Sequence, residues 1–399
     1  MSDRLLLTAM SCATPAGFGL EATTAGLAAK TKPCSIKNYE FHSFDEEVPA
    51  YLIPQSWDAA TVLGKSGLRT KDRSTKLLLS TIETGLKGIF SDRAPEKKPG
   101  LSIGTAFGSV QSIGDFLSDS IVSGVNAVNP VLFANTVINS PVGNANIRYE
   151  IKSLSATSSG TFNAGLDAMI YAADHIRSGH HDAILAGGLE EVSYYTTLGF
   201  KRSGLLSKAA SSRPFASDAD GVICGEGCAL FLIETAKSAA DAGRSAIAYI
   251  SGYAQTFDPN SGVRGFNPDA EAATVAVNQA LAMAGLTASD ISFVASGASG
   301  NPASDAIEAT VISSIFGNVP VAAYKAQFGE SYGAAPALAV AAAIIDAKRG
   351  FITGTGSDYK VSGNVNLVKA DTAVNAKHVL VTSFSCDGNC AALILSMAD

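Results

Sequence analysis

Residues 212–227 read SRPFASDADGVICGEG, and this stretch decides the fold. A glycine-rich turn ends it, and the apolar run CALFL at residues 228–232 predicts a strand directly after the turn. A second glycine turn feeds an apolar strand at residues 386–394, which read CDGNCAALI. Two such pairs at corresponding places indicate a duplicated α/β unit.

Strand and helix patterns N-terminal to this stretch indicate a parallel crossover. We expect a strand over Ser155–Phe162, a helix over Ala164–Ser178 and a strand over His181–Gly188. Strand, helix and strand in so short a segment form a parallel crossover unit. The turn at residues 161–165 has a counterpart at 326–335, which an Ala-rich helix again follows.

The length of the chain also favours two similar halves. With 399 residues, it is too long for one simple core. We place the joint so that residues 1–238 form an N-terminal half and residues 239–399 a C-terminal half. Near the start, Arg4–Ala9 predicts a strand, and the charged residues 40–47 predict a surface loop.

Composition excludes several classes of protein. The chain is 47% hydrophobic and only 16% charged, which predicts a compact fold throughout. Its net charge is 29 minus 36, or −7, and there is no basic stripe, so nucleic acid is not an expected partner. The longest apolar stretch, Ala334–Ile345, is shorter than the ~18 residues of a membrane helix. We therefore expect no membrane partner and a cytoplasmic location.

Six cysteines leave two interpretations open. Cys224 and Cys228, like Cys386 and Cys390, are separated by three residues, a spacing that could hold a zinc ion. Strand-like apolar runs follow both pairs, which favours small buried thiols instead. No metal and no cofactor are expected.

With these motifs in place, the chain resembles the β-ketoacyl synthase family. Residues 212–227 are similar to that family's Arg-Pro-Phe-Asp, Arg-Asp-Gly and Gly-Glu-Gly signature, and Ile176–Gly179, Ala186–Gly188 and Lys325–Gly329 match further pieces. The resemblance implies an α/β, thiolase-like, five-layered α-β-α-β-α fold built from two pseudo-repeated halves. It also implies a dimer across one sheet.

The chemistry of this family needs a cysteine nucleophile on a strand-to-helix turn. A thiolate there is a strong nucleophile, which a helix N-terminus and a backbone oxyanion hole assist. Counting back from Ala186–Gly188 places this position at Phe162. A second register would place Thr157 or Ser158 there and lengthen the following helix by five residues. Neither register supplies a cysteine.

Two histidines complete the family's catalytic triad, and the resemblance implies that both are lost. Ser296 stands in the turn where the first is expected, and Glu330 stands in the Gly-His position of the second. The five histidines of the chain lie elsewhere, at His42, His175, His180, His181 and His378.

Other positions of the family are altered or kept. Cys386 and Asp387 replace residues of its C-terminal glycine-rich gate, whereas Lys325 and Glu308 are retained. For Lys325 we favour a structural ion pair with a nearby carboxylate.

These departures imply a chain-length factor: a non-catalytic subunit that heterodimerises with an active ketosynthase and shapes the tunnel in which the acyl chain grows. We expect Phe107, Leu132 and Phe133 to face that tunnel. The acyl carrier protein would bind mainly through the partner. The segment 133–143 is most like the chain-length factors of bacterial aryl polyene biosynthesis.

Two alternatives remain open. The chain could be a pure scaffold that only stabilises the ketosynthase. It could also be an enzyme of altered chemistry that uses Glu330, Cys386, Asp387 or Cys390 in a remodelled cavity.

Overall fold

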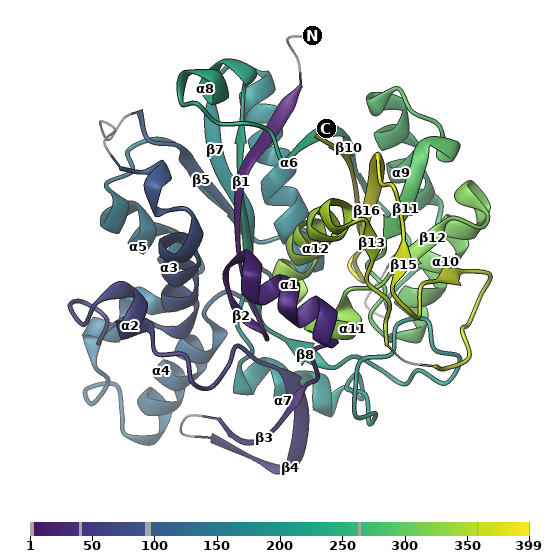
Figure 1. Cartoon of the computed structure of the whole chain (residues 1–399). Helices are drawn as coiled ribbons and strands as arrows, with labels where there is room; N and C mark the ends of the chain where they lie inside the picture. Colours follow the sequence, from purple (N-terminus) through teal and green to yellow (C-terminus); the bar gives the residue numbers. More distant parts are fainter. Residues whose placement is uncertain (1–3, 40–41, 92–96, 262–264, 357, 399) are drawn as a thin grey trace.

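The computed structural model describes residues 4–39, 42–91, 97–261, 265–356 and 358–398 (Figure 1). One mixed sheet of twelve strands runs through both halves of the chain. The N-terminal half contributes β1 (Leu5–Thr14), β2 (Gly17–Phe18), β5 (Gly100–Gly104), β6 (Ser155–Ser158), β7 (Ala183–Glu190) and β9 (Gly227–Glu234). The C-terminal half contributes β10 (Ala248–Phe257), β11 (Ile291–Ala295), β12 (Pro320–Ala322), β14 (Asn366–Leu367), β16 (His378–Phe384) and β17 (Asn389–Met397).

The order of the strands shows the duplication. Apart from β2, which pairs with β1, and β14, which pairs with β12 at the sheet edge, the order is β6-β5-β7-β9-β1 in the N-terminal half and β12-β11-β16-β17-β10 in the C-terminal half. Numbered along the chain within each half, both orders read 3-2-4-5-1. The two halves meet where Leu5–Leu7 of β1 pairs antiparallel with Ala248–Ile250 of β10. The sheet is therefore continuous across the pseudo-repeat.

Helices cover both sides of each half-sheet, which confirms the five-layered thiolase-like fold. Two helices lie in the middle layer, α6 (Ala164–Arg177) and α12 (Ala335–Arg349) (Figure 1). The outer face of the N-terminal half-sheet carries α3 (Arg73–Gly85) and α5 (Ser140–Tyr149), and that of the C-terminal half-sheet carries α9 (Glu271–Ala284) and α10 (Pro302–Phe316). Three hydrophobic cores fill the spaces, one in the middle and one under each outer layer.

The middle layer explains the Ala-rich composition of α12. Every residue from Ala335 to Asp346 is buried, because strands or helices cover all sides of this helix. A helix without a solvent face is apolar all round, and Ala side chains let the two sheets approach it closely. This helix is the Ala-rich segment that the sequence predicts.

Equivalent turns lead into α6 and α12. Each is a short 3₁₀ turn, η4 (Thr161–Asn163) and η6 (Tyr332–Ala334). Each begins with a residue in the left-handed region, at φ 57° for Thr161 and 47° for Tyr332. Because non-glycine residues rarely adopt this conformation, its presence at both turns supports a common origin. The strand expected over Ser155–Phe162 is wrong in its second half, since the chain leaves the sheet after Ser158 to make this turn.

Shorter elements connect the layers. They are α1 (Gly19–Ala29), β3 (Cys34–Tyr39), β4 (His42–Tyr51), α2 (Ala59–Leu63), η1 (Lys87–Ile89), α4 (Val110–Val122), η3 (Pro130–Thr136), α7 (Tyr194–Arg202), β8 (Cys224–Gly225), α8 (Ala236–Asp241), η5 (Ala288–Asp290), α11 (Lys325–Phe328), β13 (Phe351–Ile352) and β15 (Thr372–Ala373).

The surface loop expected over residues 40–47 is a strand instead. Residues 40 and 41 lie outside the described residues, and from His42 onwards the chain forms β4, which pairs with β3. Charged residues occupy its exposed positions, while Phe44 and Val48 are buried. The charged residues Asp45, Glu46 and Glu47 therefore lie in an irregular part of this strand, between the pairs Asn38–Ser43 and Ile36–Val48, and not in a loop.

The proposed division at residues 238 and 239 falls inside α8, between β9 and β10. It stays a prediction, because the two half-sheets share one continuous ladder and a common middle core.

In the described part of the chain, no helix is both long and apolar enough to cross a membrane.

Glycines allow the close packing of strands and turns around the two middle helices. A Cβ atom on Gly104 of β5 would lie 1.9 Å from the carbonyl oxygen of Ala164, at the start of α6. One on Gly188 of β7 would lie 2.6 Å from the carbonyl oxygen of Gly333. Real Cβ atoms do not approach backbone so closely, so these positions exclude any side chain.

We expect Gly104→Ala to lower the free energy of unfolding by about 1–3 kcal/mol or more, because the backbone of α6 must move. Gly199→Ala in α7 is a matched control, since its Cβ would meet nothing within 4 Å. That change should stabilise the chain by about 0.5–1 kcal/mol. Urea denaturation measures both, and equal effects of the two substitutions would contradict this account of the middle layer.

Candidate functional site

Four aromatic rings from different elements pack together where the two equivalent turns meet. Phe107 follows β5, Phe162 lies in η4, Phe200 in α7 and Tyr332 in η6. All six pairs of rings are in contact, with centroids 5.0–6.4 Å apart. Tyr332 is fully buried, and the three phenylalanines are half-buried around it. We call this set the four-ring cluster.

The phenol of Tyr332 is anchored below the cluster. Its hydroxyl donates a hydrogen bond to Sγ of Cys224 over 2.9 Å. Burial raises the pKa of Cys224 to about 11, so the sulfur is a thiol at neutral pH. Cys224 therefore serves as a packing and hydrogen-bonding partner and not as a nucleophile.

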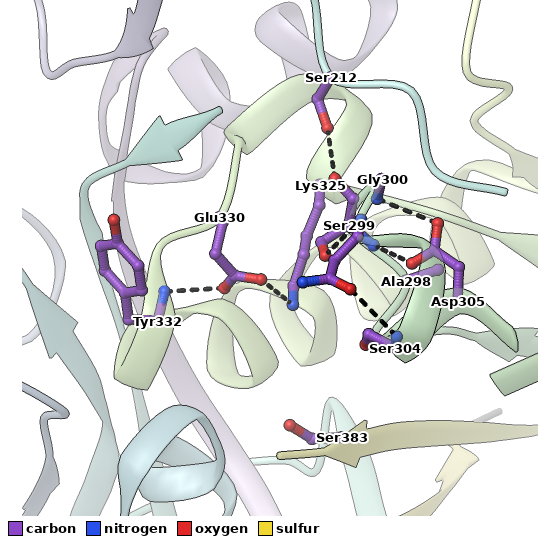
Figure 2. A network of polar contacts seen from close by, with 12 residues as sticks. Ser212, Ala298, Ser299, Gly300, Ser304, Asp305, Lys325, Glu330, Tyr332 and Ser383 are labelled. Carbon is purple, nitrogen blue, oxygen red and sulfur yellow. Dashed lines mark hydrogen bonds and ion pairs between the residues drawn. The ribbon is translucent and has the colours of Figure 1, made fainter. Parts of the chain in front are cut away.

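Next to the cluster, Glu330 is held by two kinds of contact (Figure 2). Its Oε2 forms an ion pair with Nζ of Lys325 at 2.7 Å, and its Oε1 accepts a hydrogen bond from the backbone N–H of Tyr332 at 3.0 Å. Glu330 is only 2% exposed. Breaking such a buried pair leaves an uncompensated charge, so Lys325 and Glu330 stabilise the turn as a unit.

Ser296 follows β11 and lies in a second buried network. Its hydroxyl donates to Oε2 of Glu308 over 2.9 Å, and the hydroxyl of Thr382 donates to the same oxygen over 2.7 Å. The N–H of Gly297 donates to Oε1 over 3.1 Å. Burial raises the pKa of Glu308 to about 7, although Lys325 opposes the shift.

Asp305 of α10 orders the loop after Ser296. It accepts hydrogen bonds from the backbone N–H groups of Ser299 and Gly300 at 2.8 and 3.0 Å (Figure 2), and from that of Phe215 at 2.6 Å. Burial raises its pKa to about 6, against these hydrogen bonds. Phe215 belongs to the stretch quoted first, so this carboxylate fixes the signature loop to the C-terminal half.

Little free space remains among these groups. A cavity lined by Ser296, Lys325 and Ser331, together with residues of α12, has a volume of only about 10 Å³. That is about the room that one water molecule needs.

The loop between β16 and β17 closes over the turn that carries Phe162. Ser385 donates to the hydroxyl of Thr161 over 2.9 Å, and the side-chain amide of Asn163 donates to the carbonyl oxygen of Asn389 over 2.7 Å. Cys386 and Asp387 lie in this loop. Burial raises the pKa values of Cys386 and of Cys390, the latter to about 12, so neither thiol has the lowered pKa of a reactive nucleophile.

The structure brings some of the predicted site residues together and separates others. Phe162, Ser296 and Glu330 lie around the paired turns, whereas Thr157 and Ser158 lie within β6, paired with Ile103 and Gly104 of β5. Leu132 and Phe133 lie in η3, outside the four-ring cluster.

Leu132 and Phe133 belong to an exposed apolar face. Phe133 is 60% exposed, and its ring contacts Phe116 at 5.8 Å. The face is built by α4, η3 and α5 beside the edge strand β6, which pairs only with β5. We define it by Leu117, Ile121, Val122, Val125, Val131, Leu132, Phe133, Val137 and Ile147, all exposed. Patches of this kind on soluble proteins mark interaction sites.

Two residues of the site are missing from the sequence-based predictions. Phe200 carries no motif, and only the fold brings α7 to the turns. Glu190 ends β7, whose eight residues are all buried. A carboxylate at the end of the apolar run AILAGGLE is the signal that could have identified it, since such groups need hydrogen-bond partners.

Comparison with known proteins agrees with this architecture. The β-ketoacyl synthase N-terminal domain matches residues 2–239, and the β-ketoacyl synthase C-terminal domain matches residues 247–357. The 3-oxoacyl-(acyl-carrier-protein) synthase 2 of Coxiella burnetii is 25% identical over 348 residues, which cover 84% of this chain and 83% of the relative. The chain belongs to the β-ketoacyl synthase family.

Solved structures share the fold over the whole chain. The ishigamide ketosynthase/chain length factor superposes with a TM-score of 0.92 at 24% identity and covers all of both chains. A structure of the ketosynthase ApeO in complex with its chain length factor ApeC, from Xenorhabdus doucetiae, gives a TM-score of 0.85 at 19% identity, with 99% of this chain and 98% of that chain covered. At these identities the likeness shows the thiolase-like fold.

The buried Glu308 makes stability depend on pH. Folding raises its pKa from 4.5 to about 7. The contribution of Glu308 to the free energy of unfolding is therefore fully present below pH 4.5 and is lost as the pH rises through 7. A shift of this size corresponds to roughly 3 kcal/mol. The substitution Glu308→Gln keeps the shape of the side chain and removes its ionisable carboxyl group. We expect the free energy of unfolding to fall less between pH 5 and pH 8 in the variant than in the wild type, and equal slopes would refute the assignment.

Proposed function

We propose that this chain is a non-catalytic chain-length factor, which pairs with an active ketosynthase and sets the length of its product. The observation that carries the proposal is the four-ring cluster. The turn between β6 and α6, where the family's nucleophile is expected, carries Phe162, and the other three rings pack around it. An aromatic side chain there supplies no nucleophile and fills the space that an acyl group would need.

The groups that would activate a malonyl substrate also differ. Ser296 and Glu330 stand where the family resemblance places two histidines. Their polar atoms are engaged by Glu308, Lys325 and the Tyr332 backbone. A carboxylate in place of a neutral imidazole cannot stabilise the negative charge that develops on decarboxylation. Losing one such group typically costs orders of magnitude in rate.

The apolar face supports a partner of the same fold. An exposed apolar face beside an edge strand that is paired on one side only is costly in a monomer and is suited to a large, permanent interface. We propose that an active ketosynthase covers it, with β6 at the contact. Leu132 and Phe133 then reach into the partner's acyl tunnel, and Phe107 forms part of its wall. An acyl carrier protein delivers the growing chain, mainly to the partner.

We further propose that the product belongs to the aryl polyene class and that the complex works in the cytoplasm. The support for the product class is the resemblance of the segment 133–143 to the chain-length factors of aryl polyene biosynthesis. Altered chemistry in the remodelled cavity has less support, because the thiols have raised pKa values and the cavity is nearly filled. A pure scaffold differs only in leaving product length unaffected.

We expect the purified chain to take up no acyl group and to release no carbon dioxide from malonyl carrier protein. Phe162→Cys should remain inactive, because Ser296 and Glu330 still supply no imidazole. Radiolabel transfer and carbon dioxide release measure this. Labelling of the wild type that disappears in Cys386→Ser would instead establish altered chemistry.

In the heterodimer, Leu132→Ala and Phe133→Ala should lengthen the product by at least one extension while initial turnover stays largely intact. A growing chain stops at a bulky wall because a further unit would overpack it, at a cost of ~1–3 kcal/mol. Ile147→Ala, on the same face but in α5, is the control. Mass spectrometry of the products measures their chain length. Unchanged product lengths with an active partner would favour the alternative of a pure scaffold that only stabilises the ketosynthase.

A further inference from the structure

Phe107 is held by its backbone as well as by its ring. The N–H groups of Ala106 and Phe107 donate to the two oxygens of Glu190, over 2.6 and 3.1 Å. The hydroxyl of Thr105 donates to the same carboxylate over 3.0 Å and accepts from the N–H of Gly108 over 3.0 Å. One buried carboxylate therefore determines the path of residues 105–108.

The same carboxylate reaches the other half of the molecule. Oε2 of Glu190 also accepts a hydrogen bond from the N–H of Gly333 over 3.1 Å. Gly333 follows Tyr332, so Glu190 joins the backbone next to two rings of the four-ring cluster. Glu190 is completely buried, and its hydrogen bonds join the segment after β5 to η6, two segments that also pack closely at Gly333, where a Cβ atom would lie 2.5 Å from the backbone nitrogen of Ala106.

The ring of Phe107 is supported from behind. It meets Tyr332 edge to face, with centroids 5.0 Å apart and planes at 84°, and it meets Phe200 at 6.3 Å and 89°. Tyr332 is fixed by its hydrogen bond to Cys224, and Phe200 by its place in α7. The ring of Phe107 can move away from this position only if its contact with Tyr332 or with Phe200 is removed.

We propose that Glu190 and Phe200 are positioning residues for chain-length control: they fix Phe107, and through it they set where the acyl chain stops. This inference rests on the proposed function, and it adds two residues that contact neither the acyl chain nor the partner's nucleophile. Phe200 prevents the ring of Phe107 from moving away from its position. Glu190 fixes the backbone of residues 105–108, which carries that ring.

The test uses the complete heterodimer and compares Glu190→Gln, Glu190→Leu and Phe200→Leu with wild type. Phe44→Leu is the matched control, because Phe44 is buried in the same hydrophobic cluster and contacts Tyr194 but not Phe107. Loss of one aromatic contact corresponds to a roughly 2- to 10-fold change in an equilibrium. We expect a change of this size in the ratio of longer to normal products for Phe200→Leu.

Glu190→Leu should broaden the product distribution further, and Glu190→Gln should lie between it and the wild type, because the amide keeps part of the hydrogen bonding. Heterodimer content by size-exclusion chromatography and the melting temperature are recorded for each variant. A merely structural role would lower the melting temperature in Phe44→Leu and Phe200→Leu alike and leave the product ratio unchanged in both.

The outcomes separate this inference from the proposed function. If Phe133→Ala lengthens the product but Phe200→Leu and Glu190→Gln leave it unchanged, the positioning role is overturned and the chain-length factor stands. If none of the three changes the product length, both are overturned. If Glu190→Leu does not fold, Glu190→Gln and Phe200→Leu still decide the question.

Discussion

The burial of α12 on all sides is the constraint on which the rest of the molecule depends. A helix without a solvent face needs a sheet against each side, and the duplicated half-sheets supply them. Bringing the two halves this close requires glycine at Gly165 and Gly188, where a Cβ atom would lie 2.6 Å from the carbonyl oxygen of Gly333 in the other half. It also forces the turns before α6 and α12 against each other, and the candidate site is built from the residues of those turns.

The candidate site combines a network of buried charged groups with a cluster of packed aromatic rings. The network of Asp305, Glu308, Lys325 and Glu330 is fully engaged in holding loops, and each of its carboxylates accepts more than one hydrogen bond or ion pair. Burying charges in this way costs free energy unless every partner is present. The rings of the four-ring cluster pack beside this network.

Much of the fold could be predicted from the sequence, because its signals are local. The glycine turn before residues 228–232, the helix after Phe162 and the Ala-rich α12 each follow from patterns within a few residues. The sequence predicts a loop at β4 because three consecutive charged residues stand between the buried Phe44 and Val48 and break the alternation that is typical of a strand. Phe200 and Glu190 could not be predicted as site residues, since their roles arise from contacts with Phe107 and Gly333, which are distant in the sequence.

The mutual contact of all four rings also constrains how this chain can change over generations. Replacing Phe162 by a small residue leaves a void bordered by three rings that were shaped to it, and such voids are costly. A smaller residue at any one position is therefore tolerated only when its neighbours, on three other elements, have already grown or shifted. Each ring therefore raises the free-energy cost of losing the others, so opening a pocket at this place requires several coordinated substitutions.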